Sequence, residues 1–206
     1  MTLRKILLLL ILPLSLAASA AKPESATAVL ARCAARVNSA RSLSARFNLT
    51  AGPNSYPCSM TLAKQKFVLD TPQMKVWYDG ATQWVYDTSA QRLSITEPTA
   101  DELLETNPFA ILNHYSRSYT CRLLKSSPGT RAVELTPKTP ATASVRSAVV
   151  TVSDKTDLPS RIVVTLTDGS TLSASLVKAE VGKAMPASAF AYDKAKYKAT
   201  EIIDLR

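Results

Sequence analysis

One histidine, His114, and three cysteines, Cys33, Cys58 and Cys121, are the candidates for nucleophilic chemistry in this chain. A Cys–His pair can act as nucleophile and base, but no local signature of a cysteine nucleophile surrounds any of the three thiols. A single histidine also excludes every metal site that needs two imidazoles. Neither of the two glycine-rich phosphate-binding motifs occurs, and glycine is scarce, with five residues. We therefore expect a protein that is not an enzyme and that holds neither a metal nor a cofactor.

The cysteines have a second interpretation as structural residues. Cys33 falls on the apolar face of a predicted helix and is expected to be a small core residue. Cys58 and Cys121 fall in predicted strands and are the candidate pair if a disulfide forms, which requires Cα atoms within about 7 Å.

The N-terminus has the pattern of a secretory signal peptide. Arg4 and Lys5 precede an apolar run over residues 6–16, and small residues follow at 17–21. We predict a signal peptide over residues 1–20, with cleavage after residue 21 as a close alternative. The run is short for a membrane anchor, so an exported, soluble protein is expected. Removing Arg4 and Lys5 lowers the formal charge from +9 to +7, which leaves a basic protein.

The remaining residues, 21–206, are expected to form a single domain in which one helix is followed mainly by strands. Ser25 can cap a helix that runs to about residue 38. After residue 42 the apolar period changes to two, with one apolar and one polar face per strand, as in antiparallel sheets. The predicted strands are near residues 43–50, 57–63, 66–71, 74–79, 82–87, 91–96, 118–124, 131–136, 145–152, 160–167 and 171–179.

Residues 97–116 interrupt the strands with two short apolar helices. Thr99 and Glu102 fit a capping box, and Asn107 can cap a second helix with Pro108 at its first position. These helices either fill the concavity of a curved sheet as a solid core or cover an apolar cavity. The expected fold is therefore α+β and mainly β: a curved antiparallel sheet of about eleven strands, with the short helices as its plug or its lid. The residues expected to line the cavity and the lid are Phe47, Leu49, Leu62, Phe67, Leu69, Trp84, Tyr86, Leu103, Leu104, Phe109 and Leu112.

Strand alternation separates the two tryptophans that flank the predicted turn at Asp79. Trp77 shares a face with Lys75 and Asp79, so it is expected to point outward, whereas Trp84 and Tyr86 share the other face. Trp84 is therefore the better cavity candidate, with ordinary packing in the sheet core as the alternative.

Several motifs, in order along the chain, resemble the periplasmic outer-membrane lipoprotein carrier family, LolA. They are Ser44-Ala-Arg-Phe47, the run 67–72 (Phe-Val-Leu-Asp-Thr-Pro) and 107–112 (Asn-Pro-Phe-Ala-Ile-Leu). Between the last two, the stretch 77–86 contains the turn Asp79-Gly80 followed by Trp84 and Tyr86. The ending 201–206 (Glu-Ile-Ile-Asp-Leu-Arg) is similar to that of LolA-like proteins of the Bacteroides group.

The resemblance implies an unclosed antiparallel β-barrel of about eleven strands with a lid of short helices over an apolar cavity. It also implies a chaperone that shields the acyl chains of lipoproteins and carries them from the inner to the outer membrane. It implies loading by an inner-membrane ABC transporter complex and, usually, unloading at an outer-membrane receptor. Proteobacterial members carry an Arg before the Phe segment, where it bonds to the lid. The stretch 63–67 (Ala-Lys-Gln-Lys-Phe) has none, and neither Lys64 nor Lys66 reproduces a planar guanidinium fork.

Other functions remain as alternatives at this point. One is a lipid-binding or lipoprotein-binding envelope-stress sensor, or a lipid-binding module without a transport role; another is a lipid-active enzyme, which lacks a catalytic constellation. Lys194, Lys196 and Lys198 alternate with small or aromatic residues, as in a charged edge strand or in a patch that attracts anionic lipid head groups or an acidic partner surface. Nucleic acid is not expected as a partner, and the chain is expected to act as a monomer.

Overall fold

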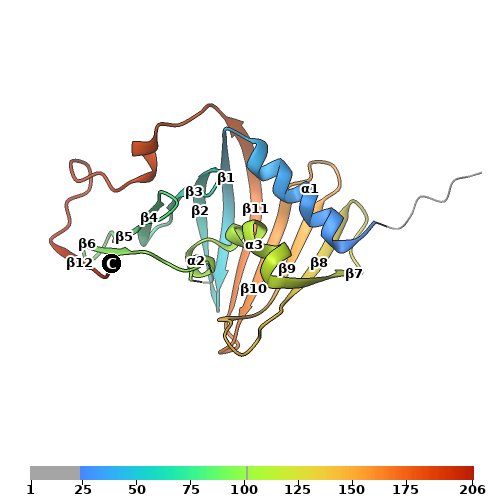
Figure 1. Ribbon diagram of the computed structural model, residues 1–206. Helices are drawn as coiled ribbons and strands as arrows, with labels where there is room; N and C mark the ends of the chain where they lie inside the picture. The colour runs from blue at the N-terminus through green and yellow to red at the C-terminus, as the bar shows by residue number, and fades with distance from the viewer. Residues whose placement is uncertain (1–23, 101) are drawn as a thin grey trace, which may run out of the picture.

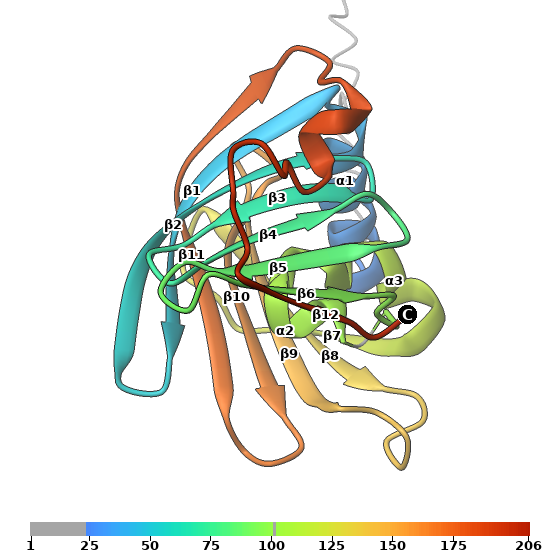
Figure 2. The same cartoon turned by 90° about the vertical axis from the view of Figure 1, so that its left-hand side faces the viewer.

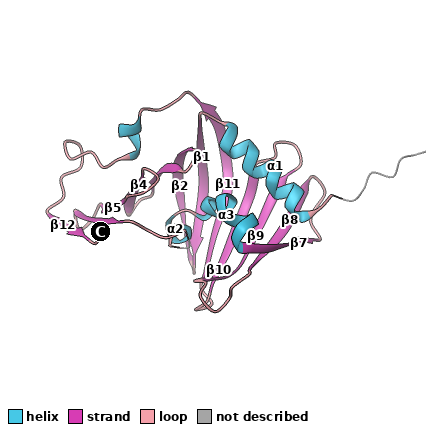
Figure 3. Ribbon diagram, in the orientation of Figure 1, coloured by secondary structure: helices cyan, strands magenta, loops and turns pink. Residues whose placement is uncertain are grey.

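The computed structural model describes residues 24–100 and 102–206, which form one curved sheet with the α-helices on its concave face (Figures 1 and 3). The helical elements are α1 (Ala26–Ser39), α2 (Leu103–Thr106), the 3₁₀ turn η1 (Pro108–Ala110), α3 (Ile111–Ser118) and the 3₁₀ turn η2 (Ala187–Phe190). The strands are β1 (Ser42–Ala51), β2 (Asn54–Ala63), β3 (Lys66–Asp70), β4 (Met74–Tyr78), β5 (Gln83–Asp87), β6 (Arg92–Thr96), β7 (Tyr119–Leu124), β8 (Thr130–Pro137), β9 (Val145–Ser153), β10 (Pro159–Leu166), β11 (Thr171–Gly182) and β12 (Glu201–Asp204).

The sheet is an unclosed barrel, as expected from the sequence. Its twelve strands lie in the order β12-β6-β5-β4-β3-β2-β1-β11-β10-β9-β8-β7. All neighbours are antiparallel except β12, which pairs parallel to β6 from Glu201 against Arg92 to Asp204 against Ile95. The twelfth strand is the one that the sequence pattern missed. The half that contains β3 to β6 turns across the half that contains β7 to β11, so the inner face is strongly concave (Figure 2).

Local sequence signals determine where the helices on this concave face begin. The Ser25 side chain caps α1 by accepting the Ala28 N–H at 3.2 Å. The capping box before α2 also forms, because the Glu102 carboxylate accepts the Thr99 N–H at 2.7 Å. Asn107 Oδ1 then accepts the Phe109 N–H at 3.0 Å and starts η1. We call residues 103–118, which comprise α2, η1 and α3, the lid.

The chain returns from β11 to β12 across the outer face of the sheet. Residues 183–200, which we call the strap, pass in front of β3 to β6 on the side away from α1 (Figure 2). The edge strand expected at Lys194, Lys196 and Lys198 is therefore wrong. These lysines lie in the irregular part of the strap, and β12 begins after them at Glu201. In the described part of the chain, no helix has the length and apolar character needed to cross a membrane.

Candidate functional site

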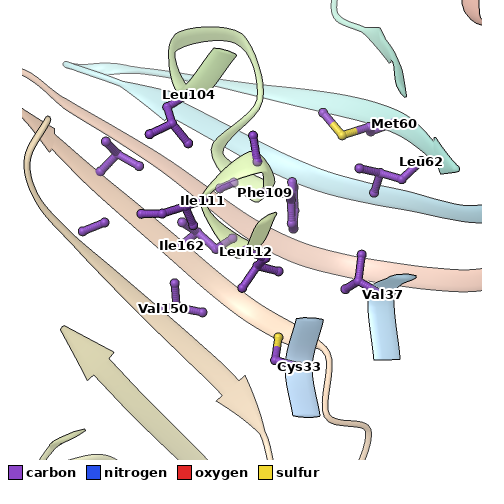
Figure 4. Close-up of a cluster of buried hydrophobic side chains, with 14 of the residues drawn as sticks. Cys33, Val37, Met60, Leu62, Leu104, Phe109, Ile111, Leu112, Val150 and Ile162 are labelled. Atoms are coloured by element: carbon purple, nitrogen blue, oxygen red, sulfur yellow. The ribbon is translucent and has the colours of Figure 1, made fainter. Parts of the chain in front are cut away.

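The inner face of the sheet and the helices enclose a single apolar cluster (Figure 4). Strand β1 shows why this face is apolar: Leu43, Ala45 and Phe47 are buried, while Ser44 and Arg46 between them are exposed. Cross-strand pairs continue the same face, since Phe47 pairs with Cys58 and Leu62 pairs with Phe67. Nine of the eleven residues predicted to line the site belong to or pack against this cluster: Phe47, Leu49, Leu62, Phe67, Leu69, Leu103, Leu104, Phe109 and Leu112.

The lid is closed and packs into this cluster. Leu104 is 2% exposed, Ile111 is 0% exposed and Leu112 is 3% exposed. The Phe109 ring meets the Phe47 ring edge-on, with 5.5 Å between centroids, so the centre of the lid rests on β1. These helices have four, three and eight residues, and helices this short are stabilised mainly by packing.

One polar contact ties α2 to the sheet, and sequence reasoning did not find it. The Gln83 side-chain amide on β5 donates to Thr106 Oγ1 at 2.8 Å. Gln83 is 6% exposed and faces inward, because it pairs with Tyr78, which in turn pairs with Phe67. Among the described residues, this is the one side-chain hydrogen bond that joins α2 and η1 to the sheet. This contact is made from β5, whereas the resemblance places an arginine contact to the lid before the Phe67 segment.

A small hollow lies beside the closed lid. It has a volume of about 130 Å³ and lies between the lid and strands β3 and β4, with Phe67, Tyr78, Leu103 and His114 among its walls. Elsewhere on this face the Phe109 ring of the lid covers the Phe47 ring. Binding of a long apolar ligand on this face therefore requires the lid to move.

Trp84 and Tyr86 are not on this face, and their predicted place in the cavity is wrong. Trp84 pairs directly with Trp77, which pairs with Val68, so the two tryptophans share the outer face. There they form a second apolar cluster with Tyr86 and Leu93. The strap covers this cluster, which explains why Trp77 is only 3% exposed although its strand position faces outward.

A larger hollow, of about 560 Å³, has Phe47 and Cys58 of the inner cluster among its walls. Arg46, Asn48, Ser59 and Val177 are also among its walls, and none of the residues that line it belongs to residues 103–118. It lies where β3 ends at Asp70 while β2 continues, so it is a notch in the sheet and not a space under the helices.

The thiols are not arranged for nucleophilic chemistry. Burial raises the pKa of Cys33 to about 12, and burial also raises the pKa values of Cys58 and Cys121, so all three thiols stay protonated near neutral pH. His114 makes no hydrogen bond to a thiol within the described part of the chain. Residues 24–100 and 102–206 also hold no group of three His, Cys, Asp or Glu side chains that could bind a metal ion.

The candidate disulfide between Cys58 and Cys121 is wrong. All three cysteines are free. Cys58 is on β2 and Cys121 is on β7, with β1, β11, β10, β9 and β8 between them in the sheet. Neighbouring strands lie about 4.8 Å apart, so this separation exceeds the reach of a disulfide.

Comparison with known proteins agrees with this architecture. A sequence profile described as outer membrane lipoprotein carrier protein LolA matches residues 16–168. The fold is similar to the crystal structure of an uncharacterized conserved protein from Thermus thermophilus, with a TM-score of 0.59 and 11% identity over 88% of this chain and 99% of that one. It is also similar to a DUF1329 family protein from Desulfovibrio piger, with a TM-score of 0.51 and 11% identity over 85% of this chain and 100% of that one. No curated protein matches the chain by sequence.

Proposed function

The chain belongs to the outer membrane lipoprotein carrier protein LolA family, and from this premise we propose that it is a periplasmic chaperone for acylated lipoproteins. The observation that carries the proposal is the lid: three short helical pieces bury Leu104, Phe109 and Leu112 against the apolar concave face of the sheet. The acyl chains of the cargo replace these contacts when the lid opens. The cargo then occupies the surface around Phe47 that Phe109 covers in the closed form.

The physical need for such a surface follows from the cargo. Each acyl CH₂ group buried away from water contributes about 0.8 kcal/mol, so a lipid-modified protein does not cross water without shielding. A carrier must also release its cargo, so the free-energy difference between the closed and loaded forms has to stay small. Exchanging lid contacts for acyl contacts achieves this, because one apolar surface replaces another on Phe47 and its neighbours.

The contact between Gln83 and Thr106 suits a lid that opens readily. A neutral hydrogen bond contributes about 0.5–1.5 kcal/mol net, which is less than a charge-assisted bond from an arginine. In the closed lid it satisfies a side chain that is 6% exposed. In the open lid, water reaches both groups and replaces the bond.

The proposed route begins with export through the signal peptide at residues 1–20. An inner-membrane ABC transporter complex loads the carrier, and an outer-membrane acceptor receives the cargo. Shielding and transfer need no bond to be made or broken, and the protonated, buried thiol of Cys33 is consistent with a role that is not enzymatic.

The test is to purify the protein from its native periplasm without detergent and to identify bound molecules by mass spectrometry. We expect acylated lipoproteins or their lipid fragments. A matched binding experiment then compares a lipopeptide with the same peptide lacking acyl chains. Equal binding of the two peptides, or native protein that carries no lipid and binds no lipopeptide, would contradict the proposal.

A further inference from the structure

Three lysines on the strap point to a function that the lid does not explain. Lys194, Lys196 and Lys198 are exposed, whereas Tyr192 and Tyr197 between and beside them pack against the outer aromatic cluster. In an edge strand, such lysines would serve to prevent strand pairing. They do not lie in a strand, so that explanation does not apply.

The backbone that carries these lysines is fixed to the sheet. The Tyr197 ring lies edge-on to Trp77, with 4.9 Å between centroids, and also contacts the Tyr86 ring at 5.6 Å. The Tyr86 hydroxyl donates to the Lys198 carbonyl oxygen at 3.3 Å. The Tyr192 hydroxyl donates to the Tyr197 carbonyl oxygen and accepts the Ala199 N–H at 3.3 Å. The lysines are therefore held in place over the outer face, unlike those of a free tail.

The charge of the strap is not compensated locally. In the part of the chain that the structure describes, none of the three lysines forms an ion pair. Lys196 lies over the Tyr197 ring at 5.5 Å, which leaves its charge in place. The only acidic residue of the strap is Asp193, and its carboxylate accepts the amide hydrogens of Ala195 at 2.9 Å and Lys196 at 3.3 Å. The acidic residues beside the strap have other partners: Asp70 pairs with Lys75, and Glu201 lies 4.0 Å from Arg92.

We propose that the strap is a docking surface for an anionic lipid membrane, with the head groups bound by Lys194, Lys196 and Lys198. Lysine is a flexible point charge, which suits a fluid surface of many phosphates and gives no fixed bidentate geometry. Protein interfaces are depleted in lysine and enriched in arginine and exposed aromatic anchors, whereas the strap turns its aromatic rings inward and contains no arginine. The surface lies on the face opposite the lid, so docking leaves the lid free to move.

The experiment measures binding of the leader-free protein to phospholipid vesicles by co-sedimentation. Vesicles of phosphatidylcholine alone are compared with vesicles that also contain phosphatidylglycerol. We expect binding only to the anionic vesicles, with an affinity that falls as salt rises, because screening weakens the attraction. The strap variant combines Lys194→Gln, Lys196→Gln and Lys198→Gln. The matched control removes the same charge from exposed positions on the other half of the sheet, with Lys125→Gln, Arg146→Gln and Lys155→Gln.

Each lysine near an anionic surface contributes roughly a fivefold increase in binding. We therefore expect the strap variant to lose more than tenfold in vesicle affinity and the control variant to lose less than threefold. Circular dichroism and thermal unfolding check that both variants fold. Equal losses in the two variants would overturn the proposal in favour of a diffuse effect of net charge. Equal binding to neutral vesicles would overturn it as well.

The protein alternative gives a different result. If wild-type protein ignores anionic vesicles while an acidic protein binds it through the same lysines, the lipid assignment is wrong. The proposal does not rest on cargo carriage, because the strap variant is expected to bind acylated lipopeptide as well as the wild type does. A loss of vesicle binding with lipopeptide binding intact therefore separates the two functions.

Discussion

Truncation of Phe109 tests whether the lid is a movable cover or part of a solid core. Phe109 is 6% exposed and contacts the Phe47 ring. In a solid core, Phe109→Ala costs about 3–5 kcal/mol of unfolding free energy. A movable lid limits this cost, because the substitution destabilises only the closed form and the variant then populates the open form. An open form populated at about 0.1–10% lies roughly 1–4 kcal/mol above the closed form, and the loss of global stability cannot exceed that difference.

A double variant makes the distinction sharp. Once Phe109→Ala has opened the lid, a second truncation in the lid has little left to remove. We expect Leu104→Ala together with Phe109→Ala to cost scarcely more than Phe109→Ala alone. In a solid core the second change adds about 2–5 kcal/mol. Leu135, which is 0% exposed on the central part of β8 and cannot leave the sheet, is the control, and Leu135→Ala is expected to show the full cost of a core truncation.

The assay pairs urea unfolding with binding of a fluorescent acyl probe. Tryptophan emission follows global unfolding without interference from the lid, because Trp77 and Trp84 both lie in the outer cluster. Probe binding is expected to increase in Phe109→Ala, since the open form becomes the major form. Additive losses of stability, together with wild-type protein that binds no probe, would refute the reasoning and remove the physical basis for a carrier.

Three further predictions follow from the same contacts. Gln83→Leu and Thr106→Val should each destabilise the closed form of the lid by about 1 kcal/mol and raise the affinity for the acyl probe by a few fold, with little further gain in the double variant. Unchanged probe affinity in all three variants would show that the bond between Gln83 and Thr106 does not hold the lid closed. Binding of an acylated lipopeptide should leave the emission maximum of Trp77 and Trp84 unshifted, whereas the strap substitution Tyr197→Ala should shift it to longer wavelength. A large shift on lipopeptide binding would place the ligand on the outer face of the sheet and contradict the proposed site. Because the pKa of Cys33 is raised, its thiol contributes stability that is complete below pH 9.0 and is lost as pH rises toward about 12. The urea midpoint should therefore fall less above pH 9.0 in Cys33→Ala than in the wild type, and identical pH profiles for the wild type and the variant would refute this.

Local signals in the sequence predicted local structure well. The helix cap at Ser25, the capping box of Thr99 and Glu102, and the cap at Asn107 all form as expected, because each depends on hydrogen bonds within three residues. The inward face of β1 was also predictable, since alternation along one strand assigns faces without knowledge of its neighbours.

Relations between distant segments were not predictable in the same way. Alternation assigned the faces within β4 and within β5, but it did not show which face of β4 continues which face of β5. The register pairs Trp77 directly with Trp84, so both tryptophans lie on the same face of the sheet. The partner of Gln83 lies 23 residues away on the lid, and an isolated glutamine in a strand carries no signal for it. Cys58 and Cys121 both fit strand positions, and only the strand order shows that they are far apart.

Under the proposed function, the two apolar faces of the β3 to β6 half keep the sheet packed when the lid opens. Val76 faces the inner cluster and Trp77 faces the outer one, so this half is packed on both sides. The outer packing comes from the strap, which is fixed by its tyrosines and continues into β12 alongside β6. When the lid leaves the inner face, the outer contacts of β5 remain. Gln83 therefore keeps its position on β5, and its side chain can donate to Thr106 again when the lid closes.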